Sequence, residues 1–254
     1  MAGHSHFANI MHKKGRADAA RGKAFSKISR LIQAAVRQGG PKPEDNPRLA
    51  LAIDKARAAN MPKDTIKRAI ARASGTAEGT DYTELTYEGY GPNGVAMLVE
   101  TLTDNRNRTG GEVRVIFDRN GGSMGASGSV AWMFERKGQF EIKADQTDEE
   151  SLFELAVEAG AEDVAQMGEG DDAVFLVTTD VAAYEDVKKA LTDAGLETSR
   201  AELAMLPTNT VDADEEIARK IMRLQGLLED NDDVQTVTTN LEVSPEVAAK
   251  LAAE

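Results

Sequence analysis

Hydrophobic residues recur at helical spacing through the first third of the chain. Phe25, Ile28 and Ile32 are separated by three and four positions, which predicts a helix over residues 22–38. The Gly-Gly-Pro sequence at residues 39–41 ends this helix, because glycine accepts the left-handed capping conformation and proline cannot continue the hydrogen-bond ladder. The first helix is therefore amphipathic, with one face available for a core.

Two more helices follow with the same kind of period. Asn46 is a good N-cap and Pro47 suits a first turn, so the second helix is expected over residues 46–60. The third is expected over residues 61–74, where apolar residues again recur every three or four positions. Three short amphipathic helices with brief connections predict a small helical domain over residues 23–76.

After the helices the pattern becomes that of strands. Residues 85–90 and 95–102 are expected to pair across a turn-rich connection, and a helix around residues 113–117 follows them. This strand–strand–helix unit lacks partners for a complete sheet. A helix over residues 213–229 and a strand over residues 234–239 can complete it from the far end of the chain.

The segment between these two parts has the order strand, helix, strand, strand, helix, strand. That order predicts a ferredoxin-like unit over residues 135–206. The expected fold class is therefore α+β, with an N-terminal three-helix domain followed by two α/β domains, one ferredoxin-like and inserted in the other. The other expected parts are a basic flexible arm over residues 1–22, an α/β domain over residues 77–134 plus 207–242, and a loose Ala-rich tail after Val243.

Composition narrows the class of protein. Of the 254 residues, 41% are hydrophobic, which is ordinary for a globular chain. No apolar run reaches about 18 residues, and the first residues lack the apolar core of a secretory signal. The absence of cysteine excludes disulfides and thiolate nucleophiles and suits a reducing compartment. A cytoplasmic protein without membrane contact is expected.

Charge is divided unequally along the chain. The net charge is −13, which by itself argues against a nucleic-acid partner. Residues 1–72 nevertheless hold 16 Lys/Arg against 5 Asp/Glu, a net charge of +11, whereas residues 73–254 carry −24. This division suggests that the basic third attracts phosphate while the acidic body is held away from it.

Basic and stacking residues crowd the arm and the first helix. A charge run is usually a solvated face, but this one is long, single-signed and interleaved with residues that stack on bases. The third helix also turns lysines away from its apolar stripe. The residues predicted to bind nucleic acid in this third of the chain are His4, His6, Phe7, Lys13, Lys14, Arg16, Arg21, Lys23, Lys27, Arg30, Lys63 and Lys67.

Two further cations, Arg106 and Arg108, stand at the junction between a predicted strand and a predicted helix in the acidic part. Asp104 or Asn105 fits a cap at the start of that helix. The two arginines either extend the grip on phosphate or clamp two domains together by pairing with acidic residues. Both alternatives are open on the sequence, and both arginines are counted among the predicted nucleic-acid contacts.

Residue types for catalysis and metal binding are scarce. His4, His6 and His12 are the only histidines, and the arm offers them no fourth ligand. The glycine-rich loop from Gly121 to Gly128 lacks the Lys-Ser/Thr pair of a phosphate-binding loop, so a flexible loop or one that approaches its neighbours closely is expected. No catalytic residue, metal site, cofactor or small-molecule substrate is predicted.

Six segments carry a resemblance to a known family: Gly3–Ile10, Asn46–Leu49, Ala58–Asp64, Tyr87–Pro92, Leu102–Thr109 and Gly128–Phe134. Together they resemble the YebC/PmpR family of probable transcriptional regulators, relatives of the mitochondrial translational activator of cytochrome c oxidase subunit one. Many members have Trp at the position of Phe7. The resemblance covers essentially the whole chain and implies three domains, a bacterial cytoplasmic protein and no enzymatic activity.

Two function classes follow from the charge and the resemblance. The expected one is a ribosome-associated translation factor, because a glycine-interrupted arm suits contact with folded ribosomal RNA. The resemblance implies that such a factor aids synthesis of proline-rich stretches. The alternative is a DNA-binding transcriptional regulator, as the family name states, with the third helix at a groove of promoter DNA. Against it, that helix has few Asn or Gln to read base edges. An acid–base hydrolase is poorly supported, because no paired-acid pattern is present.

Overall fold

The computed structural model describes residues 21–75, 81–168, 170 and 173–252, so most of the predicted arm lies outside the described residues. The chain divides into two compact units. The first unit contains the residues up to Leu49, Lys63–Glu135 and the residues from Leu206 onward, and the second contains Ala50–Pro62 and Arg136–Met205. The four-part division expected from the sequence remains a prediction.

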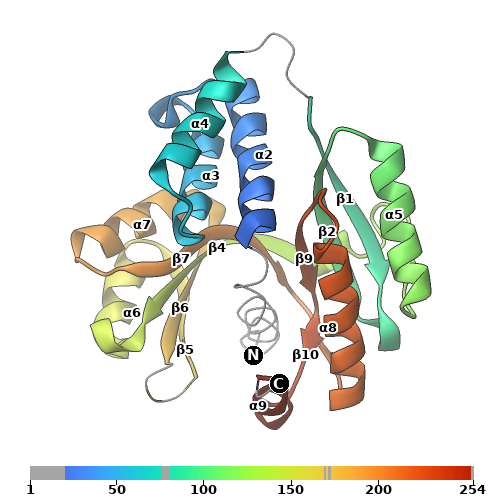
Figure 1. Ribbon diagram of the computed structural model, residues 1–254. Coiled ribbons are helices and arrows are strands. Elements are labelled where there is room, and N and C mark those ends of the chain that lie inside the picture. The colour runs from blue at the N-terminus through green and yellow to red at the C-terminus, as the bar shows by residue number, and fades with distance from the viewer. Residues whose placement is uncertain (1–20, 76–80, 169, 171–172, 253–254) are drawn as a thin grey trace. The chain divides into compact units, whose positions relative to one another are not determined.

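Helices α2 (Arg21–Gly39) and α4 (Lys63–Ser74) of the first unit lie side by side (Figure 1). Their apolar stripes bury Ile28, Ile32 and Ile66, as the periodicity predicted. Burying a side chain of this size contributes roughly 1.5–3 kcal/mol. The polar sides of both helices are therefore positioned by a packed apolar side.

Helix α3 (Pro47–Ala58) begins after the predicted cap residue Asn46. The Asn46 side-chain oxygen accepts a hydrogen bond from the Leu49 N–H at 3.1 Å. Its amide nitrogen donates to the carbonyl oxygens of Ala35 at 2.8 Å and Gly40 at 2.9 Å. One buried amide thus starts α3 and also satisfies carbonyl groups at the end of α2.

The first unit contains an antiparallel sheet in the order β3-β1-β2-β9, in which β3 is the short strand Ser123–Met124. Strand β2 (Ala96–Thr103) is central and pairs with β1 (Thr83–Tyr90) and with β9 (Val234–Thr239). As predicted, the edge strand β9 therefore comes from the far end of the chain. Helices α5 (Arg106–Arg119) and α8 (Glu215–Glu229) lie side by side on this sheet (Figure 1). The core beneath them is made of Met97, Val99, Val113, Phe117, Leu224, Leu228, Val234 and Val237.

The second unit has the strand order of a ferredoxin-like sheet, β5-β6-β4-β7. Two helices pack against its strands and bury Phe140, Leu152 and Val187 at the centre of the core. An ion pair between Lys188 and Asp54 joins the Ala50–Pro62 segment to this unit. The elements are β4 (Phe134–Lys143), α6 (Glu149–Glu158), β5 (Ala161–Met167), β6 (Val174–Asp180), α7 (Tyr184–Asp193) and β7 (Thr198–Pro207). The predicted α+β fold class is confirmed.

The expectation of a loose tail after Val243 was wrong. Helix α9 (Pro245–Ala252) forms there, and the Val247 N–H donates to the Ser244 hydroxyl at 3.3 Å, as at a helix N-terminus. Val243 and Ala248 are buried against Ile221. The Ala-rich composition favours a helix, because alanine has the highest helix propensity, and a proline at the first position is well tolerated.

Three short strands were also missed. Strand β3 (Ser123–Met124) lies within the glycine-rich loop, while β8 (Val211–Asp212) and β10 (Leu241–Glu242) form a parallel pair. Strand β4 begins at Phe134, one residue before the start predicted for the ferredoxin-like unit. Two-residue strands carry no periodicity of their own, so only their long-range pairing defines them.

Candidate nucleic-acid interface

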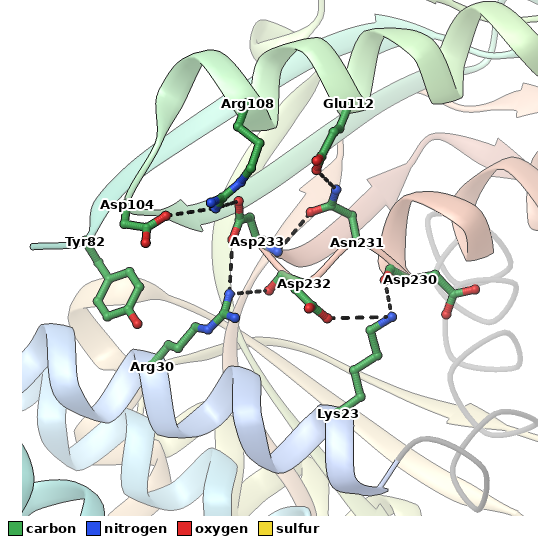
Figure 2. Close-up of a pocket in the computed structure, with 10 residues that line it drawn as sticks. All are labelled: Lys23, Arg30, Tyr82, Asp104, Arg108, Glu112, Asp230, Asn231, Asp232 and Asp233. Atoms are coloured by element: carbon green, nitrogen blue, oxygen red, sulfur yellow. Dashed lines mark hydrogen bonds and ion pairs between the residues drawn. The ribbon is translucent and has the colours of Figure 1, made fainter. Parts of the chain in front are cut away.

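The basic side of α2 meets the acidic loop, residues 229–233, which comprises the last residue of α8 and the connection to β9 (Figure 2). Lys23 Nζ donates to the carbonyl oxygen of Asp230 and lies 3.7 Å from the carboxylate of Asp232. One turn further along, Lys27 Nζ donates to the carbonyl oxygen of Glu229 at 2.6 Å. Two of the predicted nucleic-acid contacts therefore have partners within the protein.

The surroundings of Lys27 weaken its hold on a proton. Burial, followed by the charge of neighbouring Lys23, lowers the pKa of Lys27 to about 8, although the acidic groups of the loop act in the opposite direction. Lys27 is therefore still mostly protonated at neutral pH. Its charge depends on the acidic loop that covers it.

Arg30, one turn beyond Lys27, binds the end of the acidic loop. Its Nη1 donates at 3.0 Å both to the carbonyl oxygen of Asp232 and to Oδ1 of Asp233 (Figure 2). The three cations of α2 are spaced by four and three residues, which places them on one side of the helix. That side of α2 is the one that the acidic loop covers.

Asp233 is the buried centre of this arrangement, with only 5% of its side chain exposed. Its Oδ2 accepts hydrogen bonds from Arg108 Nη2 at 2.5 Å, Thr109 Oγ1 at 2.7 Å and Thr103 Oγ1 at 3.0 Å. Burial acts to raise the pKa of Asp233, but the hydrogen bonds from the guanidinium and the two hydroxyls outweigh it and hold the pKa below its ordinary value. Asp233 is therefore a paired, ionised carboxylate.

The two arginines at the start of α5 have different surroundings. Asn105 caps the helix by accepting the Arg108 N–H at 3.1 Å, so the predicted cap is present. The Arg108 guanidinium pairs with Asp104 and Asp233, which is the clamping alternative. Arg106 is exposed. Arg108 and Arg30 come from different helices and meet at Asp233.

A cavity of about 490 Å³ lies between these groups. Its lining is almost entirely charged or polar, with cations and carboxylates paired across it (Figure 2). Pockets for small organic ligands have a similar volume but are lined mainly by apolar and aromatic side chains. This lining is instead that of an ion-pair network. Its residues are Lys23, Arg30, Tyr82, Asp104, Arg108, Glu112, Asp230, Asn231, Asp232 and Asp233.

Helix α4 presents its basic side differently. Lys63 and Lys67 are exposed, one turn apart, while Ile66 and Ala69 face the core. Arg68 bonds within its own helix, to the Asp64 carbonyl oxygen at 3.2 Å and to Thr65. Within the described residues, neither Lys63 nor Lys67 forms an ion pair. The predicted cations of α4 are thus available to a partner.

The remaining predicted contacts fall where the structure gives no side-chain geometry. The positions of His4, His6, Phe7, Lys13, Lys14 and Arg16 lie outside the described residues, and of Arg21 only the backbone, at the start of α2, is described. The acidic loop was not singled out on the sequence. Its signal was the run Glu-Asp-Asn-Asp-Asp at a helix-to-strand junction, which by itself looks like a solvated turn.

The glycine-rich loop after α5 is held by a carboxylate of the protein. Glu88 is buried and accepts hydrogen bonds from the N–H groups of Gly128 at 2.6 Å, Val130 at 2.7 Å and Ala131 at 2.7 Å. Burial acts to raise the pKa of Glu88, but these three donors outweigh it and lower the pKa. The N–H group of the last loop glycine and two N–H groups just after the loop are therefore already used.

In the described part of the chain, no cluster of three or more His, Asp or Glu side chains has the arrangement of a metal site. Among the same residues, no helix combines the length and the apolar character needed to cross a bilayer.

Comparison with known families decides the classification. Residues 5–76 match the family described as the TACO1/YebC protein N-terminal domain, and residues 82–241 match the family described as the TACO1/YebC second and third domain. The chain belongs to the TACO1/YebC family. The resemblance seen in the six sequence motifs is thereby confirmed.

Full-length relatives in this family have regulatory names. A probable transcriptional regulatory protein of Persephonella marina is 52% identical over 99% of this chain and 100% of its own length. The transcriptional regulatory protein PmpR of Pseudomonas aeruginosa is 51% identical over 99% of this chain and 100% of its own length. These names describe TACO1/YebC proteins as regulators rather than enzymes.

A crystal structure of a similar protein supports the fold of this chain. The conserved hypothetical protein Aq1575 of Aquifex aeolicus is 46% identical and superposes with a TM-score of 0.79, covering 91% of this chain and 93% of its own. The α+β arrangement of three N-terminal helices and two α/β parts is thus shared with a solved protein structure.

Proposed function

We propose that this chain is a non-enzymatic, cytoplasmic regulator of gene expression that binds nucleic-acid phosphates through its basic N-terminal third. The observation that carries the proposal is the exposed pair Lys63 and Lys67 on α4, within a region of net charge +11. DNA is the favoured target, because relatives across the whole length of the chain are named transcriptional regulatory proteins.

The chemistry of α4 indicates contact with the backbone of the nucleic acid. Lysine is a compact point charge that binds phosphate, and each phosphate contact releases counterions from the polyanion. The exposed side of α4 offers Lys and Arg but no Asn or Gln, which are the side chains that read adenine edges. We therefore expect strong salt dependence and a modest preference among DNA sequences.

The test uses the full chain and a duplex of promoter DNA. Replacing both α4 lysines, Lys63→Gln/Lys67→Gln, should lower the slope of log affinity against log salt by roughly 1.8, about 0.9 for each lost contact. The matched control is Lys189→Gln/Lys220→Gln, which removes two exposed lysines from the acidic part. Equal weakening by the two double variants would contradict a role for α4.

A second candidate is a translation factor that binds ribosomal RNA and aids synthesis of proline-rich stretches. The same absence of Asn and Gln from exposed α4 positions favours it, since recognition of folded RNA relies on shape and phosphates. Co-sedimentation with ribosomes, together with ribosome profiling in a deletion strain, distinguishes the two. Stalling at proline-rich codons supports the RNA target, whereas unchanged ribosome occupancy with promoter footprints supports DNA.

A further inference from the structure

We propose that the α2 side covered by the acidic loop is a second phosphate-binding surface, and that the loop is its built-in competitor. This inference rests on the proposed function and concerns how the same nucleic-acid interface is regulated. The loop occupies Lys23 and Lys27 as a stretch of phosphodiester backbone would, with carbonyl and carboxylate oxygens in place of phosphate oxygens.

The oxygens of the loop follow the cations of α2 in order. Lys27 meets the Glu229 carbonyl oxygen, Lys23 meets Asp230 and Asp232, and Arg30 meets the end of the loop. A chain of anionic and carbonyl oxygens thus runs along one side of a basic helix. An extended polyanion has the same complementarity to such a side, because lysine binds carboxylate and phosphate alike as a point charge.

Two parts of the loop differ in how firmly they are held. Asp233 is almost fully buried and hydrogen-bonded to two arginines, so it anchors the loop. Asp232 has 68% of its side chain exposed and meets Lys23, which is itself 39% exposed, at 3.7 Å. Exposed pairs of this kind contribute little stability and are screened by salt. Lys23 can therefore exchange the Asp232 carboxylate for a phosphate oxygen while Asp233 keeps the loop in place.

The experiment removes the exposed charges of the loop and leaves its anchor. The full chain with Asp230→Asn/Asp232→Asn is titrated with a 25-base-pair DNA duplex and with an RNA hairpin at several salt concentrations. The control is Glu154→Gln/Glu158→Gln, which removes two exposed carboxylates from α6. The control matches the change in net charge, so a general electrostatic effect appears equally in both variants.

The loop variant should gain one phosphate contact. One contact adds roughly 0.9 to the salt slope on duplex DNA, which corresponds to about eightfold tighter binding at 0.1 M salt relative to a 1 M reference. Adding Lys23→Gln to the loop variant should remove this gain, whereas Lys23→Gln alone should leave the affinity of the otherwise unchanged chain as it is. Unaltered thermal unfolding of the loop variant shows that the fold is kept.

The outcomes separate this inference from the proposed function. In one outcome, the loop variant binds no more tightly than the α6 control while Lys63→Gln/Lys67→Gln still weakens binding. This result contradicts the inference that the loop competes with phosphate, and it agrees with the proposed function. A gain that survives Lys23→Gln also overturns it. If no variant binds either probe, both the proposed function and the inferred competition by the acidic loop are contradicted.

Discussion

Helices α2 and α4 are both amphipathic, both basic and both packed in the first unit, yet their cations have different partners. On α2, Lys23, Lys27 and Arg30 bond to the acidic loop. On α4, Lys63 and Lys67 are exposed. The difference teaches that the net charge of a segment predicts where a basic surface lies. It does not predict which cations of that surface pair within the protein, because that pairing depends on residues distant in the sequence.

The two surfaces also differ in what a bound polyanion must displace. An exposed lysine on α4 gives up only water and counterions when it binds phosphate. A lysine on α2 must first leave an oxygen of the acidic loop. We therefore expect α4 to supply the primary phosphate contacts. The lysines of α2 contribute only when the oxygens of the acidic loop are displaced from them.

The largest expected loss of stability follows replacement of Asp233, the residue that anchors the acidic loop. Asp233→Ala removes the carboxylate that Arg30 and Arg108 share, together with the acceptor of two threonine hydroxyls. Breaking a buried pair costs about 3–5 kcal/mol, and because the Arg108 side chain is partly exposed we expect the lower end, about 3 kcal/mol. Urea unfolding at neutral pH measures the loss.

The matched control for the anchor is Asp104→Ala. Asp104 meets the same Arg108 guanidinium at 2.8 Å, but it is exposed. We expect it to cost less than about 1 kcal/mol. Equal destabilisation by the two variants would show that burial of Asp233 is unimportant.

A smaller effect is expected at the glycine-rich loop, which is held by Glu88 rather than by a basic residue. Glu88→Gln leaves one oxygen acceptor for three N–H donors and turns an amide toward them. An unsatisfied buried group costs about 1–3 kcal/mol, so unfolding should occur at lower urea concentration. The salt slope of nucleic-acid binding should not change. A lower salt slope for Glu88→Gln would contradict the account. It would mean that a general loosening of the fold weakens nucleic-acid binding, and the effect of the lysine variants could then not be assigned to their lost charges.

The pH dependence of stability sharpens the role of Asp233. Its pKa in the folded chain lies below the ordinary value, so as the pH falls the unfolded state takes up the proton first. The stability that the carboxylate contributes is therefore fully present above about pH 4 and is lost as the pH falls through the folded pKa. The stability difference between the wild type and Asp233→Asn should shrink below pH 4. A constant difference between pH 7 and pH 3 would contradict the pairing.

Most of the fold follows from local signals in the sequence. Helical spacing of Ile28 and Ile32 and the cap at Asn46 locate the N-terminal helices, and the order of elements locates the ferredoxin-like unit. Helix α9 was missed because its Ala-rich sequence was interpreted as a loose tail, although alanine and the preceding Ser-Pro pair favour a helix.

The candidate site was predictable only in part. Exposure of Lys63 and Lys67 follows from their positions opposite the apolar stripe of α4. The partners of Lys23 and Arg30 lie about 200 residues further along the chain, and no local pattern connects a basic helix with a particular acidic turn. Pairing of this kind depends on the tertiary fold, which brings α2 beside the end of α8.

One comparison of single lysines tests the central claim most directly. The salt dependence of DNA binding is measured for the full chain and for Lys67→Gln and Lys23→Gln, which remove one charge each from α4 and α2. If Lys67 of α4 is available to phosphate and Lys23 of α2 is occupied by the acidic loop, Lys67→Gln lowers the slope by roughly 0.9 and Lys23→Gln leaves it unchanged. Equal losses, or a loss confined to Lys23→Gln, would contradict the account.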